Sequence, residues 1–348
     1  MSRESHNDMR SLEPLPAFIT EAPDADRGLI CAFQMSATEP PREIHGDAIL
    51  ESLTRSDVVT WLHFNLTDAR ARRWLLAAAE FLPPAVRELL RELAADRRIE
   101  AVEGRLLLVM SDFTFEDDSD PWEVATLWCF VDAHSLITAR LHPVKSTDDL
   151  RQQLRSGAGS ASLMELLGRL LDLRSSRLRQ LANTMSARLD DIEDEILAGN
   201  ISQQREQLGR SRRLCARLRR QFAPERLDMA KFLHGPGAQL SETNRDLLRA
   251  CIDSLGYTIE EVAEIYERAK LLQEELASRL AENTGRNLYV LSILTAVLLP
   301  MTLVTGIFGM NVAGLPGMHG GTSFWWVMLL IIASGAVTLA MFFWRRLL

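Results

Sequence analysis

Two uncharged stretches near the end of the chain decide its architecture: residues 288–308, LYVLSILTAVLLPMTLVTGIF, and residues 324–344, FWWVMLLIIASGAVTLAMFFW. Each holds 21 residues without a charged side chain. A helix rises about 1.5 Å per residue, so each stretch matches the roughly 30 Å hydrocarbon core of a bilayer. A soluble core helix rarely needs so long an uncharged run, and here two follow one another. The sequence therefore predicts a hairpin of two transmembrane helices joined by residues 309–323.

The rest of the chain, residues 1–286, is too polar to lie in a membrane and suffices for one sizeable domain or two small ones. The formal net charge of the whole chain, −8, argues against a nucleic-acid partner. The four cysteines form no C-x-x-C pair, so they predict neither a disulfide framework nor a cysteine zinc site. Residues 1–23 lack the apolar core of a signal peptide. We expect residues 1–24 to be disordered.

Positive charges lie at the outer ends of the two apolar stretches and not in the loop that connects them. Arg279 and Arg286 precede the first stretch, and Arg345 and Arg346 follow the second, whereas residues 309–323 contain no Lys or Arg. By the positive-inside rule, both termini, including the tail 345–348, lie in the cytoplasm and the loop lies outside. The large polar body is then cytosolic.

The first part of the body mixes strand patterns with helix patterns, which predicts an α/β domain over residues 25–155 within an α+β fold class. Short β-branched and aromatic runs predict strands at residues 29–34, 58–64, 105–110, 123–131 and 135–140. Residues 68–80 and 83–95 have helical patterns, the second with a proline in its first turn, where a missing N–H costs nothing.

Residues 156–287 predict long, coiled-coil-like cytosolic helices. Apolar residues from Leu178 to Ile196 recur every three or four positions until Gly199-Asn200, which is typical of a C-cap. A short basic helix over residues 203–222 is expected to end before Pro224. A heptad pattern from Leu248 to Ala269 then predicts one continuous helix from about Ser241 through Gly306.

A single hairpin encloses no aqueous path, so transport through it requires several copies around an axis. Small and hydroxyl residues are frequent on the first apolar helix, and aromatic residues border the second at both ends. We therefore expect the first helix to line a pore and the second to face lipid. Helical spacing predicts one pore-lining stripe: Leu288, Leu291, Thr295, Leu299 and Thr302.

The tripeptide Gly309-Met310-Asn311 ends the first apolar helix. Gly permits a sharp exit from the helix. Asn offers a carboxamide oxygen and a backbone carbonyl, which are neutral ligands that hold a cation or its water. A ring of Asn311 side chains at the outer mouth would select ions without a fixed charge.

The order of these elements and the stretch from Tyr289 to Asn311, with Pro300-Met301-Thr302 in its middle, resemble the CorA superfamily of divalent-cation transporters. Residues 61–65 (WLHFN), 82–87 (LPPAVR) and 219–224 (RRQFAP) are more similar to its ZntB zinc-transporter branch. The resemblance covers most of the chain, densely from Arg286 onward. It implies a homopentameric funnel in the bacterial inner membrane, with a wall of long helices, the stripe facing a central pore, and Asn311 at the mouth.

The choice of metal depends on the loop after the tripeptide. CorA magnesium channels usually carry acidic residues there, whereas residues 312–323 hold no Asp or Glu, which favours the zinc branch. His319 is a candidate zinc ligand, although one His in a glycine-rich loop is more often only solvated. Four carboxylates on the long helices are candidates for a regulatory divalent site between subunits, although solvated helix faces are the more common explanation: Asp190, Asp194, Glu260 and Glu264.

We therefore expect Zn²⁺ transport across the inner membrane, driven by the membrane potential. A potential of 100 mV contributes a free energy of about 2.3 kcal/mol for each charge that crosses. Proton coupling stays open, because neither span holds Asp, Glu, His, Lys or Arg and the sequence therefore shows no path for a proton. The alternatives are a Mg²⁺, Co²⁺ or Ni²⁺ channel of the same plan and a membrane-anchored coiled-coil protein that conducts nothing. We find no nucleophile–base pair and no phosphate-binding loop, and so expect neither an enzyme nor a cofactor. The expected partners are further copies of the chain, lipid and the transported cation.

Overall fold

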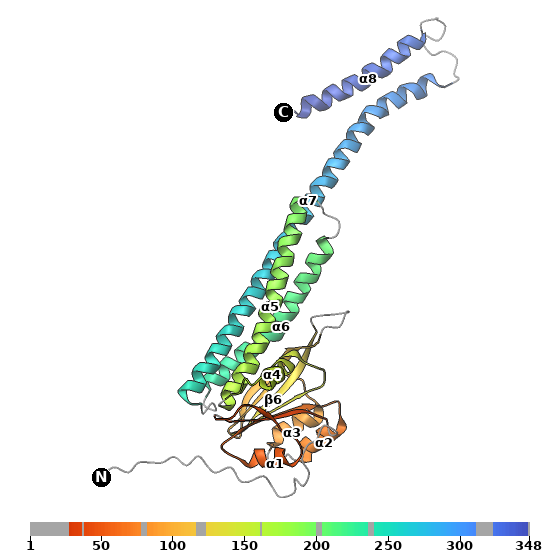
Figure 1. The fold of residues 1–348 in the computed structure, drawn as a ribbon. Coiled ribbons are helices and arrows are strands. Elements are labelled where there is room, and N and C mark those ends of the chain that lie inside the picture. The colour runs from red at the N-terminus through yellow and green to blue at the C-terminus, as the bar shows by residue number, and fades with distance from the viewer. Residues whose placement is uncertain are drawn as a thin grey trace. The chain divides into compact units, whose positions relative to one another are not determined.

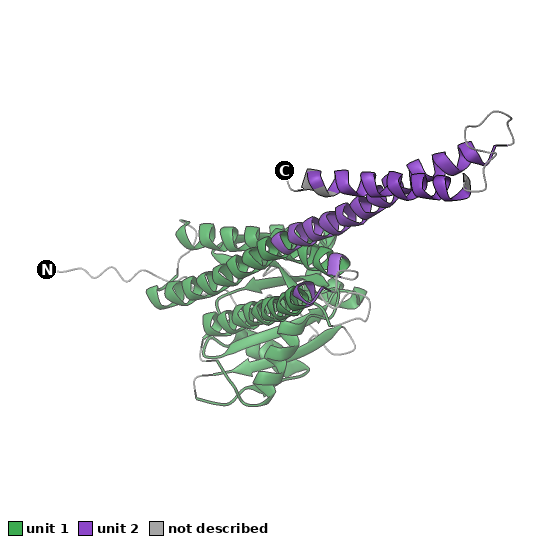
Figure 2. Ribbon diagram, turned by 90° about the horizontal axis from the view of Figure 1, so that it is seen from above, with its two compact units in different colours: residues 1–194, 206–270 green, residues 195–205, 271–348 purple. Residues whose placement is uncertain are grey.

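The computed structural model describes residues 28–36, 38–77, 82–115, 123–160, 162–199, 204–235, 240–310 and 323–346. The expected disordered start lies outside this range, as do residues 311–322 of the outer loop. The chain divides into two compact units, shown in Figure 2. Unit 1 comprises residues 1–194 and 206–270, and unit 2 comprises residues 195–205 and 271–348.

Unit 1 is built on a seven-stranded sheet with the order β2-β1-β3-β7-β6-β5-β4 (Figure 1). The described strands are β1 (Leu29–Met35), β2 (Arg42–Glu43), β3 (Val59–Asn65), β4 (Arg98–Val102), β5 (Arg105–Phe113), β6 (Val124–Val131) and β7 (Ser135–Arg140). Strands β3 and β7 are parallel, and the other neighbours are antiparallel. All five expected strands are present, and the short β2 and β4 are additions. Glu103 and Gly104 both have positive φ, as a two-residue hairpin turn between β4 and β5 requires.

One face of the sheet packs on three short helices: α1 (Asp47–Thr54), α2 (Ala69–Ala77) and α3 (Pro84–Glu92). Leu62 and Phe64 of β3 belong to this core. Because side chains alternate along a strand, Trp61 and His63 point to the opposite face. Helix α4 (Lys145–Arg155), which directly follows β7, lies on that side, with Val144 and Thr147 near His63. Helices α1 and α4 were not expected from the sequence.

Long helices make up the rest of the described chain: α5 (Leu163–Leu197), α6 (Gln204–His234), α7 (Glu242–Phe308) and α8 (Ser323–Arg346). Helix α5 is followed by Gly199 in the left-handed conformation, which confirms the expected C-cap. The Ser241 hydroxyl accepts the backbone N–H of Asn244 at 3.3 Å and begins α7. Helix α7 then continues unbroken for 67 residues, which confirms the single helix expected from about Ser241 through Gly306.

The expected end of the basic helix before Pro224 is wrong, because α6 continues to His234 with Pro224 inside it. A proline has no N–H, so the carbonyl four residues earlier, that of Arg220, loses its helical partner. Arg97, in the segment before β4, replaces that partner. Its Nη1 donates to the Arg220 carbonyl at 2.9 Å and also to the Gln221 carbonyl. Arg97, which supplies the donor that Pro224 lacks, lies 123 residues from Arg220 in the sequence.

A candidate pore-lining helix

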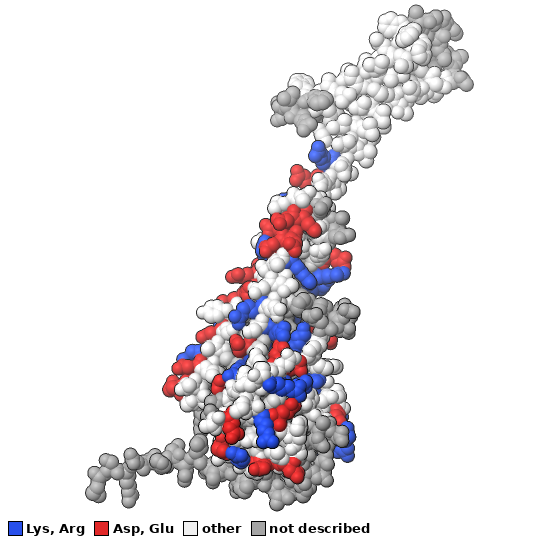
Figure 3. Space-filling model, in the orientation of Figure 1, with Lys and Arg blue, Asp and Glu red and all other residues white. Residues whose placement is uncertain are grey.

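The C-terminal part of α7 and helix α8 are long and apolar enough to cross a membrane. Their most apolar windows are 0% and 6% buried, whereas the core helix of a soluble protein is mostly buried. Figure 3 shows charged side chains over the visible face of unit 1 and none over the apolar hairpin. In water this exposed apolar surface would be far larger than soluble monomers tolerate, so a lipid environment or further protein must cover it.

One face of the apolar part of α7 packs against α8 within unit 2. Gly335 of α8 is buried there. A Cβ at that position would lie 1.9 Å from Met301 Cε and 3.7 Å from Val297 Cγ1. A glycine at a helix crossing lets the two backbones approach closely, which is a common device in membrane helices. The half-buried residues of this face recur at helical spacing: Ile293, Ala296, Val297, Pro300, Met301, Val304 and Phe308.

The predicted pore-lining stripe lies on the other side of α7. Its five residues are all exposed in unit 2: Leu288, Leu291, Thr295, Leu299 and Thr302. With 3.6 residues per turn, Thr295 and the α8-facing Val304 lie roughly 180° apart around the axis. The packing of the hairpin therefore leaves this stripe free to face another partner.

The stripe carries two hydroxyls whose hydrogens are already in use. Thr295 Oγ1 donates to the Leu291 carbonyl and Thr302 Oγ1 to the Leu298 carbonyl, each at 2.8 Å. A threonine hydroxyl has one hydrogen and two lone pairs. With the hydrogen turned back to the helix, the exposed oxygen offers only lone pairs. Such neutral oxygen atoms can accept hydrogen bonds from water or lie against a cation.

The expected mouth is described only in part. Helix α7 ends at Phe308, and Gly309 donates its N–H to the Thr305 carbonyl at 2.8 Å. A Cβ at Gly309 would lie 2.9 Å from that carbonyl oxygen, so a larger residue would disturb this exit from the helix. Met310 is about half exposed. The two candidate ligands Asn311 and His319 lie outside the described residues.

The four acidic candidates do not meet within one copy of the described chain. Asp190 is held by Arg268 of α7 at 2.6 Å, and Arg268 also contacts Glu193. Hydrogen bonds to Glu193 and Asp190 raise the pKa of Arg268. Asp194, Glu260 and Glu264 are exposed on their helices. No group of three His, Cys, Asp or Glu residues suited to a metal ion occurs in the described part of the chain.

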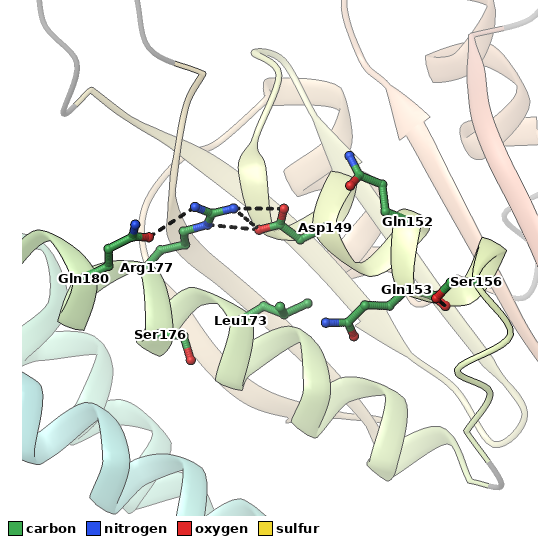
Figure 4. A pocket seen from close by; sticks show the side chains of 8 residues that line it. All are labelled: Asp149, Gln152, Gln153, Ser156, Leu173, Ser176, Arg177 and Gln180. Carbon is green, nitrogen blue, oxygen red and sulfur yellow. Dashed lines mark hydrogen bonds and ion pairs between the residues drawn. The ribbon is translucent and has the colours of Figure 1, made fainter.

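Unit 1 also has an open groove of about 550 Å³ between α4 and α5, which sequence reasoning missed. Figure 4 shows Arg177 at one end, turned toward Asp149 and Gln180. Arg177 donates through Nη2 and Nε to Asp149 at 2.8 and 3.0 Å and through Nη1 to Gln180 at 3.2 Å. The two charges of the groove thus neutralise each other. The other polar lining groups are amides and hydroxyls, including those of Gln153 and Ser176.

The family model described as CorA-like Mg²⁺ transporter protein matches residues 56–346, which include strands β3 to β7 of the sheet and the hairpin. The chain belongs to this CorA-like family. The resemblance noted in the sequence is thereby confirmed. The match covers most of the residues that form unit 1 and all of the described hairpin.

Members of the CorA-like family and related structures agree with this assignment. The chain is 30% identical over 325 residues to the Divalent cation transporter CmaX of Pseudomonas aeruginosa, covering 92% of this chain and 97% of that protein. It is 27% identical over 291 residues to the Zinc transport protein ZntB of Klebsiella pneumoniae, covering 82% and 87%. The structure of full-length CmaX superposes with a TM-score of 0.76 at 29% identity, covering 92% and 98%. The expected fold class, a mixed α/β domain followed by long helices and a C-terminal helix, is confirmed.

Proposed function

We propose that this chain transports a divalent cation, Zn²⁺, across the inner membrane through the centre of a homopentamer. The observation that carries the proposal is the free stripe of α7, which lies opposite α8 and presents the hydroxyl oxygens of Thr295 and Thr302. Membership of the CorA-like family supports divalent-cation transport. The names of the relatives, a divalent-cation transporter and a zinc transport protein, support it further.

The pore needs several copies, because a hairpin of two helices has no lumen. In the proposed assembly each copy turns its α7 stripe to the axis and its α8 to lipid. Gly335 and Met301 then hold the two helices of each copy together. Every polar position on the stripe is a neutral oxygen, so the ion passes hydrated or partly hydrated.

The preference for zinc rests on the neutral loop. Residues 312–323 contain no Asp or Glu, and the same region holds His319, whose imidazole suits zinc. Similarity to a zinc transport protein is consistent with this preference. A Mg²⁺ channel is the second candidate, because the family description names that ion. For either ion, a negative cell interior supplies about 4.6 kcal/mol per 100 mV for two charges.

The orientation follows from the arginines. Arg279 and Arg286 precede the first span and Arg346 follows the second, while residues 309–323 hold no Lys or Arg. We therefore place both termini and unit 1 in the cytoplasm and the Asn311 mouth outside. The ion would meet Asn311 first and the α7 stripe next.

The test is ion flux into proteoliposomes that contain the purified full chain, with Zn²⁺ and Mg²⁺ compared and a pH gradient present or absent. We expect Zn²⁺ uptake that exceeds Mg²⁺ uptake, and a loss of about tenfold or more in Asn311→Ala if that side chain coordinates the ion's water. Asn244→Ala makes the same chemical change in the first turn of α7 and should leave the flux unchanged. Uptake of neither ion would support a non-conducting anchored protein instead. Equal Mg²⁺ flux that ignores the pH gradient would identify the magnesium channel.

A further inference from the structure

A second, smaller cavity lies in unit 1 beside α4, at the ends of the parallel strands β3 and β7. Its volume is about 40 Å³. His63 comes from β3, Arg140 is the last residue of β7, and Thr147, Asp148 and Arg151 come from α4. The register of the two strands places Asn65 opposite Arg140, and His63 opposite Thr138. With Ile30 of β1, the cavity is lined by groups from four elements, three strands and one helix.

The positive charges at this cavity exceed the negative ones. The guanidinium of Arg140 makes no hydrogen bond to any residue that the structure describes, and burial lowers the pKa of Arg140. The Nε of Arg151 is buried and also has no partner among the described residues. Among the described lining residues the one carboxylate is that of Asp148, whose Oδ1 forms an ion pair of 3.7 Å with Arg151 Nη2, beyond hydrogen-bonding distance. Asp148 also accepts the Gln152 amide at 2.9 Å.

The imidazole of His63 is an uncharged part of the cavity lining. It is only 2% exposed, and its Nδ1 lies 2.8 Å from Thr138 Oγ1, which also accepts the Trp61 indole N–H. Burial lowers the pKa of His63 to about 3, so the ring carries no charge at neutral pH. Two guanidinium groups, one carboxylate and a neutral imidazole leave one positive charge in excess. A metal ion would be repelled from such a cavity.

The groove of Figure 4 provides an internal comparison. There Arg177 also lines a hollow beside α4, but Asp149 and Gln180 take up its donors. At the smaller cavity no described residue accepts a hydrogen bond from the guanidinium of Arg140 or from the Nε of Arg151, and Arg151 meets Asp148 only in an ion pair of 3.7 Å. Because buried donors are almost always paired in native proteins, the buried Nε of Arg151, beside the guanidinium of Arg140, points to a ligand that the described residues do not supply.

We propose that Arg140 and Arg151 bind a small oxyanion, a phosphate group, in this cavity. A guanidinium presents paired N–H donors that match two oxygens of a phosphate. One buried water needs about 10–15 Å³ by the same kind of volume, so this cavity has room for about three waters or a group of that size, and not for a nucleoside. The phosphate could be inorganic or belong to a small monoester. The site is independent of the proposed cation pore.

The test is calorimetric titration of the full chain in detergent with sodium phosphate, in metal-free buffer at constant ionic strength. We expect one saturable site per chain, weakened about tenfold or more by Arg140→Gln and by Arg151→Gln. Arg249→Gln removes an equal charge from the exposed Arg249–Asp246 pair of α7 and should bind like the wild type. No saturable binding, equal binding in all variants, or equally tight chloride binding would each overturn the proposal. Methyl phosphate, titrated in parallel, shows whether the source is the free ion or a monoester.

A further variant distinguishes loss of the binding site from misfolding of the protein. Asp148→Asn removes the carboxylate that competes for the two arginines, so it should bind phosphate severalfold more tightly. A misfolded protein could not give that result. Folding of every variant is checked by thermal unfolding and size-exclusion chromatography. Unchanged or weaker phosphate binding by a folded Asp148→Asn protein would contradict the assignment of the site.

Discussion

Arg174 of α5 and Glu225 of α6 form an ion pair of 2.6 Å, and their side chains are only 3% and 0% exposed. Both also bind the backbone of β5. Arg174 Nε donates to the Ser111 carbonyl at 3.0 Å, and the Ser111 N–H donates to Glu225 Oε2 at 3.2 Å. Glu225 directly follows Pro224, where Arg97 completes the hydrogen bonding of α6. Two charged contacts thus join the sheet to the long helices within unit 1.

Removal of one member of this pair should destabilise unit 1 strongly. In Glu225→Gln the shape is kept, but the buried Arg174 loses the carboxylate to which it is hydrogen-bonded. Breaking a buried pair in this way typically costs about 3–5 kcal/mol. The matched control is Glu206→Gln in the exposed pair with Arg210 on the same helix, for which about 0–1 kcal/mol is expected. Thermal unfolding of the purified chain compares the two variants, and equal shifts would contradict this account.

Asp112 should make the stability of unit 1 depend on pH. It is fully buried, and burial raises the pKa of Asp112 to about 6, although Arg174 and the hydrogen bonds from Ser146 and Phe113 act to lower it. In the unfolded chain the pKa of an aspartate is about 3.9. The folded state therefore binds the proton more tightly, and its stability falls as the pH rises from about 4 to about 6.

This dependence can be isolated with Asp112→Asn. The difference in unfolding free energy between wild type and variant should change by about 2 kcal/mol from pH 4 to pH 7, in favour of the variant at the higher pH. The amide oxygen can still accept from the Ser146 hydroxyl and the Phe113 N–H. The other carboxylates contribute equally to the pH dependence of both proteins, so their contributions cancel in the difference. Parallel curves for the two proteins over this range would show that Asp112 does not titrate as described.

Arg97 and Pro224 should be energetically coupled. In the wild type, Arg97→Gln leaves the Arg220 carbonyl without a donor, at a cost of about 1–3 kcal/mol. In a Pro224→Ala background the backbone N–H returns to that carbonyl, so the same Arg97 substitution should cost less. The double-mutant cycle, measured by thermal unfolding, should give a coupling above about 0.5 kcal/mol. Additive effects would mean that Arg97 does not compensate for the proline.

These long-range contacts also mark the limit of sequence reasoning for this chain. The two long apolar helices and the unbroken α7 were predictable because long apolar runs and heptads are local signals. Helix α4 was missed because its sequence, KSTDDLRQQLR, offers only Leu150 and Leu154 as apolar positions. Sequence reasoning missed the continuation of α6 past Pro224 and the buried Arg174–Glu225 pair for the same reason. Their partners lie far away in the sequence, and a buried arginine looks like any other arginine on a helix.

The candidate pore-lining stripe of α7 was predictable from the sequence, but its packing partners were not. Helical spacing alone grouped Leu288, Thr295 and Thr302 on one side of α7, and the structure places α8 on the other side. The glycine contact between Gly335 and Met301 gave no signal in the sequence, because small residues are frequent on both apolar helices. The four acidic candidates do not meet within one copy of the described chain, and the site between subunits for which they were named stays a prediction.

Gly335 should tolerate a small substitution and reject a large one. The atom that a Cβ would meet is Met301 Cε, the end of a flexible side chain, so Gly335→Ala should be accommodated by a shift of Met301. Gly335→Leu should overpack the crossing and cost about 1–3 kcal/mol. Met301→Ala should rescue it. Ala336→Leu, at the exposed neighbouring position of α8, serves as the control in thermal unfolding. A harmless Gly335→Leu would show that the two helices do not cross there.

The hydroxyls of α7 should matter for ion flux and not for folding. Thr→Val keeps the shape and removes the oxygen, so Thr295→Val and Thr302→Val would replace the lone pairs on the proposed pore wall with methyl groups. Without those oxygens the hydrated ion loses its neutral contacts on the stripe, and we expect Zn²⁺ uptake into proteoliposomes to fall about tenfold in the double variant. Thr338 of α8 donates to its own backbone in the same way, at 2.8 Å to the Ser334 carbonyl, but lies on the helix assigned to lipid. Thr338→Val should therefore leave the flux unchanged, and equal losses in both helices would contradict the assignment of the pore to α7.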